Sequence, residues 1–367
     1  LPRIGIGITT HNRPETLDKT LEHHRRHLPP GARLVVVDDA SDIQPMHADY
    51  RFERNVGIAR AKNKCIELLM ATDPAPDHIF LFDDDAYPLV DGWHLPYVES
   101  PEPHLMYQFN AFANGQAIGD AESVPTDGEH YALTNARGPM LYLDTRILPI
   151  VGGMDPAFGL FGYEHGDWSN RIHHAGLTTW RYADVAARGL IHSMDEHLEV
   201  ERSVKRPVRE QSVAINRELF ERRIAERDAS YVEYREPVNV VLTSLYTHVK
   251  DPQRPGRNGL DHHAADKLLD SLRGQSVVMV TDQVDGLIGQ GPVAIIQDEP
   301  TMSVYFARHV AHLQYLRAHP EITYAWCVDA TDVVLQGDPW ADMRPDTLFI
   351  GYEAAIVDTP WMRQHSG

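Results

Sequence analysis

Three apolar runs, each followed at once by polar residues, constrain the fold of this chain more than any other feature. Residues 4–9, 34–37 and 78–82 read as short strands, and helical patterns follow the first two of them, over 17–28 and 57–70. This alternation predicts a largely parallel α/β sheet that helices cover on both faces. Such sheets bind ligands at the carboxyl ends of their strands, which is where the polar clusters lie.

The length of 367 residues predicts two domains. We place the first at residues 1–235. It ends in a helix from Val208 to about Arg227 that packs back on the domain through an apolar side made of Val208, Ile215, Leu219 and Ile224. Pro237 marks a break, and residues 236–367 read as a second, smaller α/β domain. Its strand-like runs are Val238–Thr243, Val277–Thr281, Val293–Gln297 and Ala325–Val328.

The formal net charge of −19 excludes broad, non-specific binding to nucleic acid, because lysine and arginine hold phosphate backbones. An anionic substrate such as a nucleotide would need a metal ion, helix N-termini or placed arginines to offset that charge.

No apolar run reaches the roughly 18 residues of a membrane span, and the N-terminal residues lack the pattern of a signal peptide. A cytoplasmic protein is therefore expected. The two cysteines, Cys65 and Cys327, lie in a helix-like and a strand-like segment and are expected to be reduced thiols in the core.

Three consecutive aspartates, Asp83 to Asp85, follow the third strand. Like charges held so close repel one another, and a divalent cation would remove that cost. Because alternate residues of an extended segment share a side, Asp83 and Asp85 are plausible ligands for Mn²⁺ or Mg²⁺. The alternative is an acidic turn that caps a helix.

Four motifs stand in the same order as in known enzymes: TTHNR at 9–13, VVVDDAS at 35–41, NVGIARAKN at 55–63 and FLFDDDAYP at 80–88. Together they resemble the family 2 and related GT-A glycosyltransferases over roughly residues 3–200. The resemblance implies a GT-A fold, with the Asp83–Asp85 motif holding a metal that bridges the diphosphate of a sugar nucleotide. It also implies the following residues around the nucleotide and sugar: Thr9, Thr10, His11, Asn12, Arg13, Asp38 at the nucleobase, Asp39, Asn55, Gly57, Arg60, Asn63 and Asp84.

A downstream segment resembles the acceptor side of the same family, which reads GGFD and then GxEDxDLxxR. This chain has Gly152 to Asp155 and then Phe161 to Arg171, with His165 where the family has aspartate after Glu164. Since that aspartate is the general base of inverting members, the base here is open. Glu164 is the first candidate, Asp167 the second and His165 the third. Alternatively, Glu164 only orients the loop and Asp167 caps a helix.

Two further residues are assigned by their position among the motifs. His192 stands where the resemblance implies a third protein ligand to the metal. Trp93 either packs against the sugar or fills the core.

The second domain carries WCVDATDVV at 326–334, which resembles the acidic motif of other nucleotide-sugar transferases. Asp329 and Asp332 would mark a second site in a second GT-A-like domain. The alternative is a purely structural α/β module.

These features predict a metal-dependent glycosyltransferase, similar to hexosyltransferases, that moves a sugar from a nucleotide-diphosphate donor to an acceptor hydroxyl. The resemblance favours UDP. A non-catalytic carbohydrate-binding relative and a bifunctional enzyme with two sites are the alternatives. A nucleotidyltransferase would carry a glycine-rich basic signature after its first strand, which residues 11–15 do not. The sugar, the acceptor and the stereochemical outcome stay open.

Overall fold

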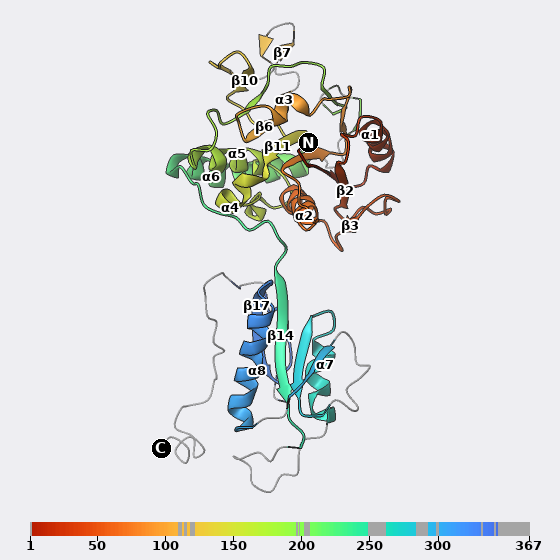
Figure 1. The fold of residues 1–367 in the computed structure, drawn as a ribbon, viewed down its shortest axis with the longest axis vertical. Helices are drawn as coiled ribbons and strands as arrows, with labels where there is room; N and C mark the ends of the chain where they lie inside the picture. Colours follow the sequence, from red (N-terminus) through yellow and green to blue (C-terminus); the bar gives the residue numbers. More distant parts are fainter. Residues whose placement is uncertain are drawn as a thin grey trace. The chain divides into compact units, whose positions relative to one another are not determined.

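The structure, a computed structural model, divides the chain into two compact units, Leu1–Glu236 and Pro237–Gly367, which are described separately (Figure 1). The residues it describes are 2–108, 112–113, 116–117, 122–195, 197, 199–201, 206–248, 262–283, 293–298, 301–331, 333–340 and 343. Among these residues, no helix is long and apolar enough to cross a membrane.

A six-stranded mixed sheet forms the centre of the first unit. Its order is β3-β2-β1-β4-β11-β6, in which β11 runs antiparallel to both of its neighbours and the first four strands are parallel. Its strands are β1 (Ile4–Thr10), β2 (Arg33–Asp38), β3 (Tyr50–Arg51), β4 (His78–Asp83), β6 (His104–Met106) and β11 (Met140–Asp144). The register pairs Thr10 with Asp38 and Thr9 with Asp83, so the polar ends of three strands meet at one edge.

Two apolar cores lie on opposite faces of this sheet. Val35 and Val37 of β2 belong to one core and Val36 to the other, because successive side chains of a strand point to opposite faces. The first core includes residues of α2 (Ile58–Met70) and α5 (Glu164–His174), and the second includes residues of α1 (Pro14–Arg26) and α3 (Leu95–Val98). The predicted α/β sheet, covered on both faces, is confirmed.

Smaller elements surround the sheet. After the three aspartates, β5 (Ala86–Pro88) pairs antiparallel with β13 (Ile191–Ser193). The others are β7 (Phe112–Ala113), β8 (Gln116–Ala117), β9 (Ser123–Val124), β10 (His130–Leu133), β12 (Ala183–Val185), the helix α4 (Leu148–Val151) and two 3₁₀ turns, Thr145–Ile147 and Pro156–Phe158.

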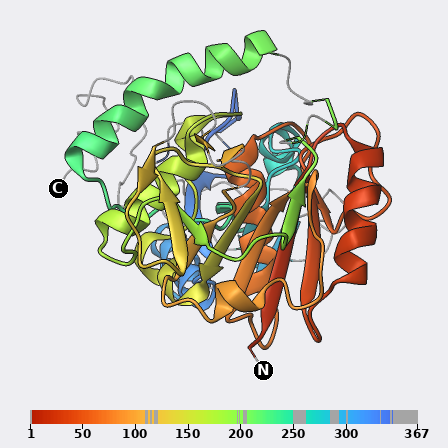
Figure 2. The same ribbon diagram turned by 90° about the horizontal axis from the view of Figure 1, so that it is seen from above.

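The long helix α6 (Arg206–Glu226) packs on the first unit (Figure 2). Its predicted apolar side does so only in part, because Leu219 and Ile224 are partly buried but Val208 is 43% exposed. Ile215 is 67% exposed, whereas Asn216 is buried and donates from its amide to three carbonyl oxygens, including that of Phe158 at 2.6 Å. Phe220 stacks on Tyr163. Polar and aromatic contacts, which apolar spacing does not report, therefore fix the rotation of this helix.

The second unit is built on a parallel four-stranded sheet in the order β16-β15-β14-β17. Its elements are β14 (Val238–Leu245), a 3₁₀ turn His262–Ala265, α7 (Asp266–Ser271), β15 (Val277–Thr281), β16 (Val293–Gln297), α8 (Val304–Ala318) and β17 (Ile322–Asp329). Cys65 of the first unit is buried, as expected. Cys327 is exposed, because β17 ends the described sheet, so the prediction of a core thiol there is wrong.

Two neutral histidines in the first unit should make the fold sensitive to acid. Burial lowers the pKa of His24 to about 3 and that of His104 to about 4. The unfolded chain then binds more protons below pH 6.5, so the free energy of unfolding should fall by about 1.4 kcal/mol per pH unit for each histidine as the pH drops from 6.5 to about 4. Denaturant titrations of the full chain across this range measure the slope.

The variant His24→Gln should reduce the slope of unfolding free energy against pH by the share of one histidine, about 1.4 kcal/mol per pH unit. It should also lower stability at pH 7. His263→Gln, at a side chain that is 63% exposed in the second unit, is the control and should leave the slope unchanged. An unaltered slope in His24→Gln would contradict the prediction.

Candidate active site

A cavity of about 690 Å³ lies where the carboxyl ends of β1 and β4 meet the start of α5. Six carboxylates and three arginines line it, so we call it the acidic cavity. These charged residues are Asp39, Asp83, Asp84, Asp85, Glu164, Asp195, Arg13, Arg137 and Arg209. Thr9, Thr10, His11 and Asn55 also belong to its wall. The polar clusters predicted at strand ends therefore share one space.

Two cations compensate the three aspartates. The Arg13 guanidinium contacts the carboxylates of both Asp84 and Asp85, the latter at 2.9 Å. The fully buried Lys62 ammonium lies 2.7 Å from an oxygen of Asp83. The Thr10 hydroxyl donates to Asp84 at 2.6 Å. Each aspartate is thus held in one orientation by a partner from β1, α1 or α2, or from the loop between β1 and α1.

The donor set at this cluster fits a divalent cation. Burial and the neighbouring charge of Asp83 raise the pKa of the Asp85 carboxyl well above its usual value, although Arg13 opposes them. Burial also raises the pKa of Asp84. Three carboxylates face only two paired cations, and a further cation at their oxygens would relieve the remaining repulsion. Carboxylate oxygens are ligands that Mn²⁺ and Mg²⁺ accept.

The structure does not bring His192 to the aspartates. Its ring lies against that of Tyr87, and its Nε2 is 3.1 Å from Glu199. In the described part of the chain, the potential metal-ligand atoms of His192, His197 and Glu199 lie within 4.8 Å of one another. Those of Asp83, Asp85 and His192 do not form such a group. Alternation along β13 turns His192 to the Tyr87 side. Asp195, three residues on, lines the acidic cavity instead.

The loop after β1 forms the other wall of the cavity. His11 Nδ1 lies 2.6 Å from the carbonyl oxygen of Asp39, and its Nε2 lies 3.2 Å from the amide nitrogens of both Asn12 and Asn55. Asp39 in turn accepts from the amides of Val56 and Gly57 at the start of α2. This predicted nucleotide wall is therefore one connected polar network.

Gly57 cannot carry a side chain without moving that wall. Its φ is +89°, and a Cβ would stand 2.3 Å from the carbonyl oxygen of Gly159. Glycine is therefore required here for close approach between two backbones. A role of Gly57 beside the ligand stays a prediction.

Six predicted nucleotide or sugar residues do not line the acidic cavity. Two of them, Asn12 and Gly57, contact residues that do, His11 and Asp39. The other four point elsewhere. Asp38 is fully buried and accepts from the Ser41 hydroxyl, and Asn63 binds the backbone of Met154. Trp93 is fully buried beside Phe80 and Phe82, so the core alternative holds for it. The side chain of Arg60 lies 3.4 Å from Glu236. These are corrections, since none of the four lines the acidic cavity.

Glu164 and His165 form a pair at the first turn of α5. The Nδ1 atom of His165 lies 2.7 Å from Glu164 Oε1. Burial opposes the ionisation of Glu164, but the His165 ring and hydrogen bonds from backbone amides together outweigh it and lower the pKa of this carboxyl. With Glu164 ionised, Nδ1 carries the ring proton and leaves a lone pair on Nε2.

His165 Nε2 is buried and has no hydrogen-bond partner among the described protein atoms. It faces Gly138, where a Cβ would stand 2.5 Å from it, so only glycine leaves room for the ring. Tyr163, two residues earlier, adopts a φ of +72°. A strained residue of this kind, next to an unpartnered lone pair in a cavity wall, is typical of functional sites.

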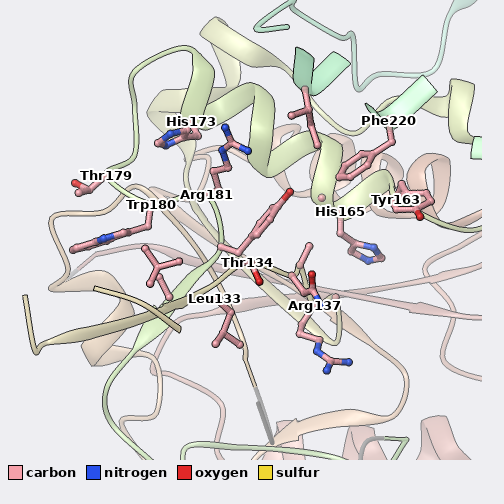
Figure 3. Close-up of a pocket in the computed structure, with 18 residues that line it drawn as sticks. Leu133, Thr134, Arg137, Tyr163, His165, His173, Thr179, Trp180, Arg181 and Phe220 are labelled. Carbon is pink, nitrogen blue, oxygen red and sulfur yellow. The ribbon is translucent and has the colours of Figure 1, made fainter. Parts of the chain in front are cut away.

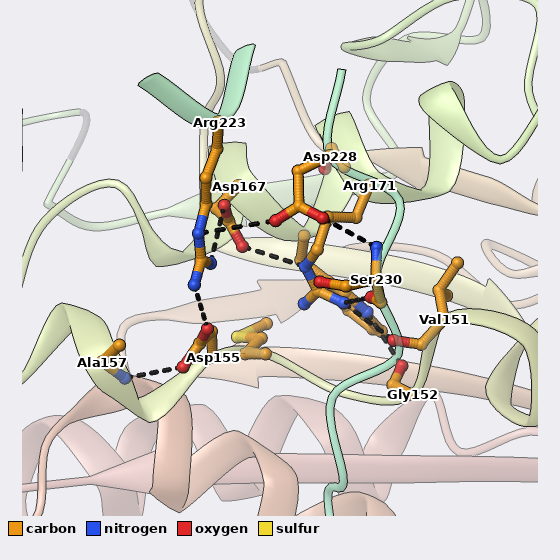
Figure 4. A network of polar contacts seen from close by, with 12 residues as sticks. Val151, Gly152, Asp155, Ala157, Asp167, Arg171, Arg223, Asp228 and Ser230 are labelled. Atoms are coloured by element: carbon orange, nitrogen blue, oxygen red, sulfur yellow. Dashed lines mark hydrogen bonds and ion pairs between the residues drawn. The ribbon is translucent and has the colours of Figure 1, made fainter. Parts of the chain in front are cut away.

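Asp167 belongs to a structural network (Figure 4). It pairs with Arg171 at 3.0 Å and with Arg223 of α6 at 3.1 Å, and Arg223 also reaches Asp155. Arg171 donates to the carbonyl oxygen of Val151. Asp167 is buried and lines no described cavity, so the structure removes this second candidate base from the site.

In the second unit, the carboxylate of Asp329 is half exposed and pairs with Arg308 of α8. Asp332 lies outside the described residues. The second site stays a prediction.

Sequence reasoning missed four residues of the acidic cluster and cavity: Lys62, Arg137, Asp195 and Arg209. Lys62 lies inside the NVGIARAKN motif, where a basic residue beside a buried helix face was a usable signal. The other three lie in loops or at the start of α6, where local spacing does not indicate what they face.

Comparison with known protein families finds one match, in the N-terminal part of the chain. Residues 6–99 match the family model described as glycosyl transferase family 2. This match confirms the resemblance carried by the four motifs between residues 9 and 88. It does not extend to the second unit. No curated protein matches the chain.

Several solved structures are similar to this chain at low identity. They include GalNAc-T7 with UDP, GalNAc and Mn²⁺ (16% identity, 50% of this chain, 42% of that chain, TM-score 0.41) and the Pyrobaculum calidifontis mannosyltransferase PcManGT with GDP-Man and Mn²⁺ (14%, 51%, 58%, 0.35). A third is S. aureus TarS 1–349 with UDP (14%, 60%, 71%, 0.38). This chain spans about half the length of the first two. These similarities are too weak to transfer ligands or residue roles.

Proposed function

We propose that the first unit transfers a sugar from a nucleotide-diphosphate donor in the acidic cavity to a hydroxyl group of an acceptor. The observation that carries this proposal is that the Asp83–Asp85 cluster and the Glu164–His165 pair line one cavity. The aspartate cluster would hold the metal that faces the diphosphate of the donor, and the Glu164–His165 pair would supply the base for the acceptor hydroxyl. UDP is the proposed nucleotide, following the family resemblance.

The residues of the cavity divide the work of holding the donor. Arg13 and Lys62 fix the three aspartates. Asp83 and Asp85 would hold Mn²⁺ or Mg²⁺, which supplies positive charge against the departing diphosphate. Arg137 and Arg209 line the same cavity and add positive charge there. The His11, Asn12 and Asn55 network offers polar groups to the nucleoside.

His165 is the proposed general base. As the acceptor oxygen bonds to the anomeric carbon, the bond from that carbon to the diphosphate oxygen breaks and the hydroxyl proton passes to His165 Nε2. Glu164 holds the ring by its Nδ1 proton and stabilises the imidazolium that forms. Direct attack in this geometry inverts the anomeric configuration.

Calorimetric titration of UDP, GDP and dTDP into the full chain, with Mn²⁺ and with EDTA, tests the proposal. We expect one nucleotide to bind only with the metal. Absence of binding in every combination would make the first unit a non-catalytic relative. Binding of equal strength in EDTA would remove the metal from the proposal.

A further inference from the structure

A second cavity, of about 820 Å³, adjoins the acidic cavity (Figure 3). The two share Ala136, Arg137, Gly138, Tyr163 and His165. The shared wall therefore contains the proposed base and the glycine that gives its ring room. A molecule in this second cavity would therefore lie beside His165.

The charge of the second cavity contrasts with that of the chain. Asp and Glu account for 53 of the 367 residues, and yet neither type is among the described residues that line this cavity. Arg137 and Arg181 do, and we call it the basic cavity. Burial lowers the pKa of His173, which also lines it, so this ring stays neutral at pH 7. The structure gives Arg181 no ion-pair partner among the described residues, and its side chain is exposed.

Aromatic rings supply much of the remaining wall. Phe220 stacks on Tyr163, with ring centroids 4.5 Å apart. The Trp180 indole donates to the carbonyl oxygen of Pro125, and the Tyr182 hydroxyl donates to Asn170, so the polar atoms of both already have partners. What they offer a ligand is ring surface. Apolar faces with a few placed charges are the usual composition of a small-molecule site.

We propose that the basic cavity binds the acceptor and that this acceptor is a sugar carrying a phosphate or carboxylate group. The anion would lie at Arg181, the sugar ring against the aromatic side chains, and the reacting hydroxyl at His165. An anionic ligand needs such a local reversal of sign, because the net charge of −19 repels it elsewhere. This inference rests on the proposed function.

Calorimetric titration of the full chain with glucose, glucose 6-phosphate and glucuronate, in the presence of UDP and Mn²⁺, tests the inference. We expect one of the two charged sugars to bind at least about tenfold more tightly than glucose, a difference of about 1.4 kcal/mol. The stronger of the two identifies the anion. Inorganic phosphate, which lacks the ring, should bind more weakly than glucose 6-phosphate.

Variants distinguish binding of the anion at Arg181 from a general effect of the charge of the protein. Arg181→Gln should reduce the binding of the charged sugar to the level of glucose, and Arg181→Lys should retain most of it. Arg188→Gln is the matched control, since Arg188 is also exposed but lies over Tyr131 and lines neither cavity. Three results would overturn the inference. All three sugars could bind equally, or none could bind at 10 mM, which is about a hundred times a typical 0.1 mM KM. Arg181→Gln and Arg188→Gln could also weaken binding of the charged sugar equally.

Failure of the inference and failure of the proposed function give different results. If UDP binds with Mn²⁺ but no charged sugar is preferred, only the acceptor assignment falls. If charged sugars bind in an Arg181-dependent way but no nucleotide does, the basic cavity stands as a binding site and the transferase proposal falls.

Discussion

Asp85→Asn should lower donor turnover by about a thousandfold or more while leaving the first unit folded. A loss of this size corresponds to about 4 kcal/mol of transition-state stabilisation, which is the scale of a metal-assisted charge effect. Asparagine has the same shape as aspartate and removes one of three crowded charges, so the melting temperature should not fall. Hydrolysis of UDP-sugars with Mn²⁺ measures the turnover, and thermal unfolding measures the fold.

The matched control for this substitution lies at the other end of β4. Asp77 pairs with Arg3 at the surface, and its side chain is 42% exposed. Asp77→Asn should keep full turnover, because surface ion pairs contribute at most about 1 kcal/mol. Full turnover in Asp85→Asn would remove this carboxylate from the proposed metal site.

His165→Ala should lower turnover by about 10²- to 10⁴-fold without weakening nucleotide binding, which is the scale of general-base catalysis. Rates across pH give a second readout. In His165→Asp, the acid limb of the kcat/KM profile should move to lower pH, because a carboxyl is protonated at lower pH than an imidazole. Assays from pH 4 to 9 with saturating donor measure both effects.

Gly138→Ala probes the same base without altering it. The added Cβ would stand 2.5 Å from His165 Nε2 and must displace the ring, so turnover should fall here too while nucleotide affinity is kept. Gly337→Ala is the comparison, because Gly337, like Gly138, has no positive φ, and nothing lies within 4 Å of its Cβ position. A His165→Ala variant with normal turnover and an unaltered pH profile would assign the base to another group, with Glu164 next.

The central strands were predictable because their apolar runs are short and end abruptly. The predicted ends of β1, β2 and β4 agree with the structure to within one residue. Parallel strands of one sheet end at the same edge, so placing the polar clusters together followed from the same pattern. The orientation of helix α6 was less predictable. Ile215 was expected to be buried but is exposed, because the contacts of Asn216 and Phe220 orient the helix.

The residues that failed as site candidates share one cause. Asp38 and Asn63 lie in motifs that border the cavity, and Trp93 follows such a motif, but all three side chains are buried and line no part of the cavity. A motif indicates which segment reaches a site, whereas the direction of each side chain depends on the partners that it finds across the sheet.

By itself, the sequence determined the α/β sheet and the edge at which Asp83, Asp85 and Asp39 gather. Apolar periodicity and strand ends are local properties, and local properties can be read from a single chain. Only the tertiary structure decided that Lys62 pairs with Asp83, that Asp195 replaces His192 at the cavity, and that His165 meets Gly138. The Lys62–Asp83 and Gly138–His165 contacts join separate elements of the fold, so packing and charge compensation between elements select them, and the pattern within one segment does not.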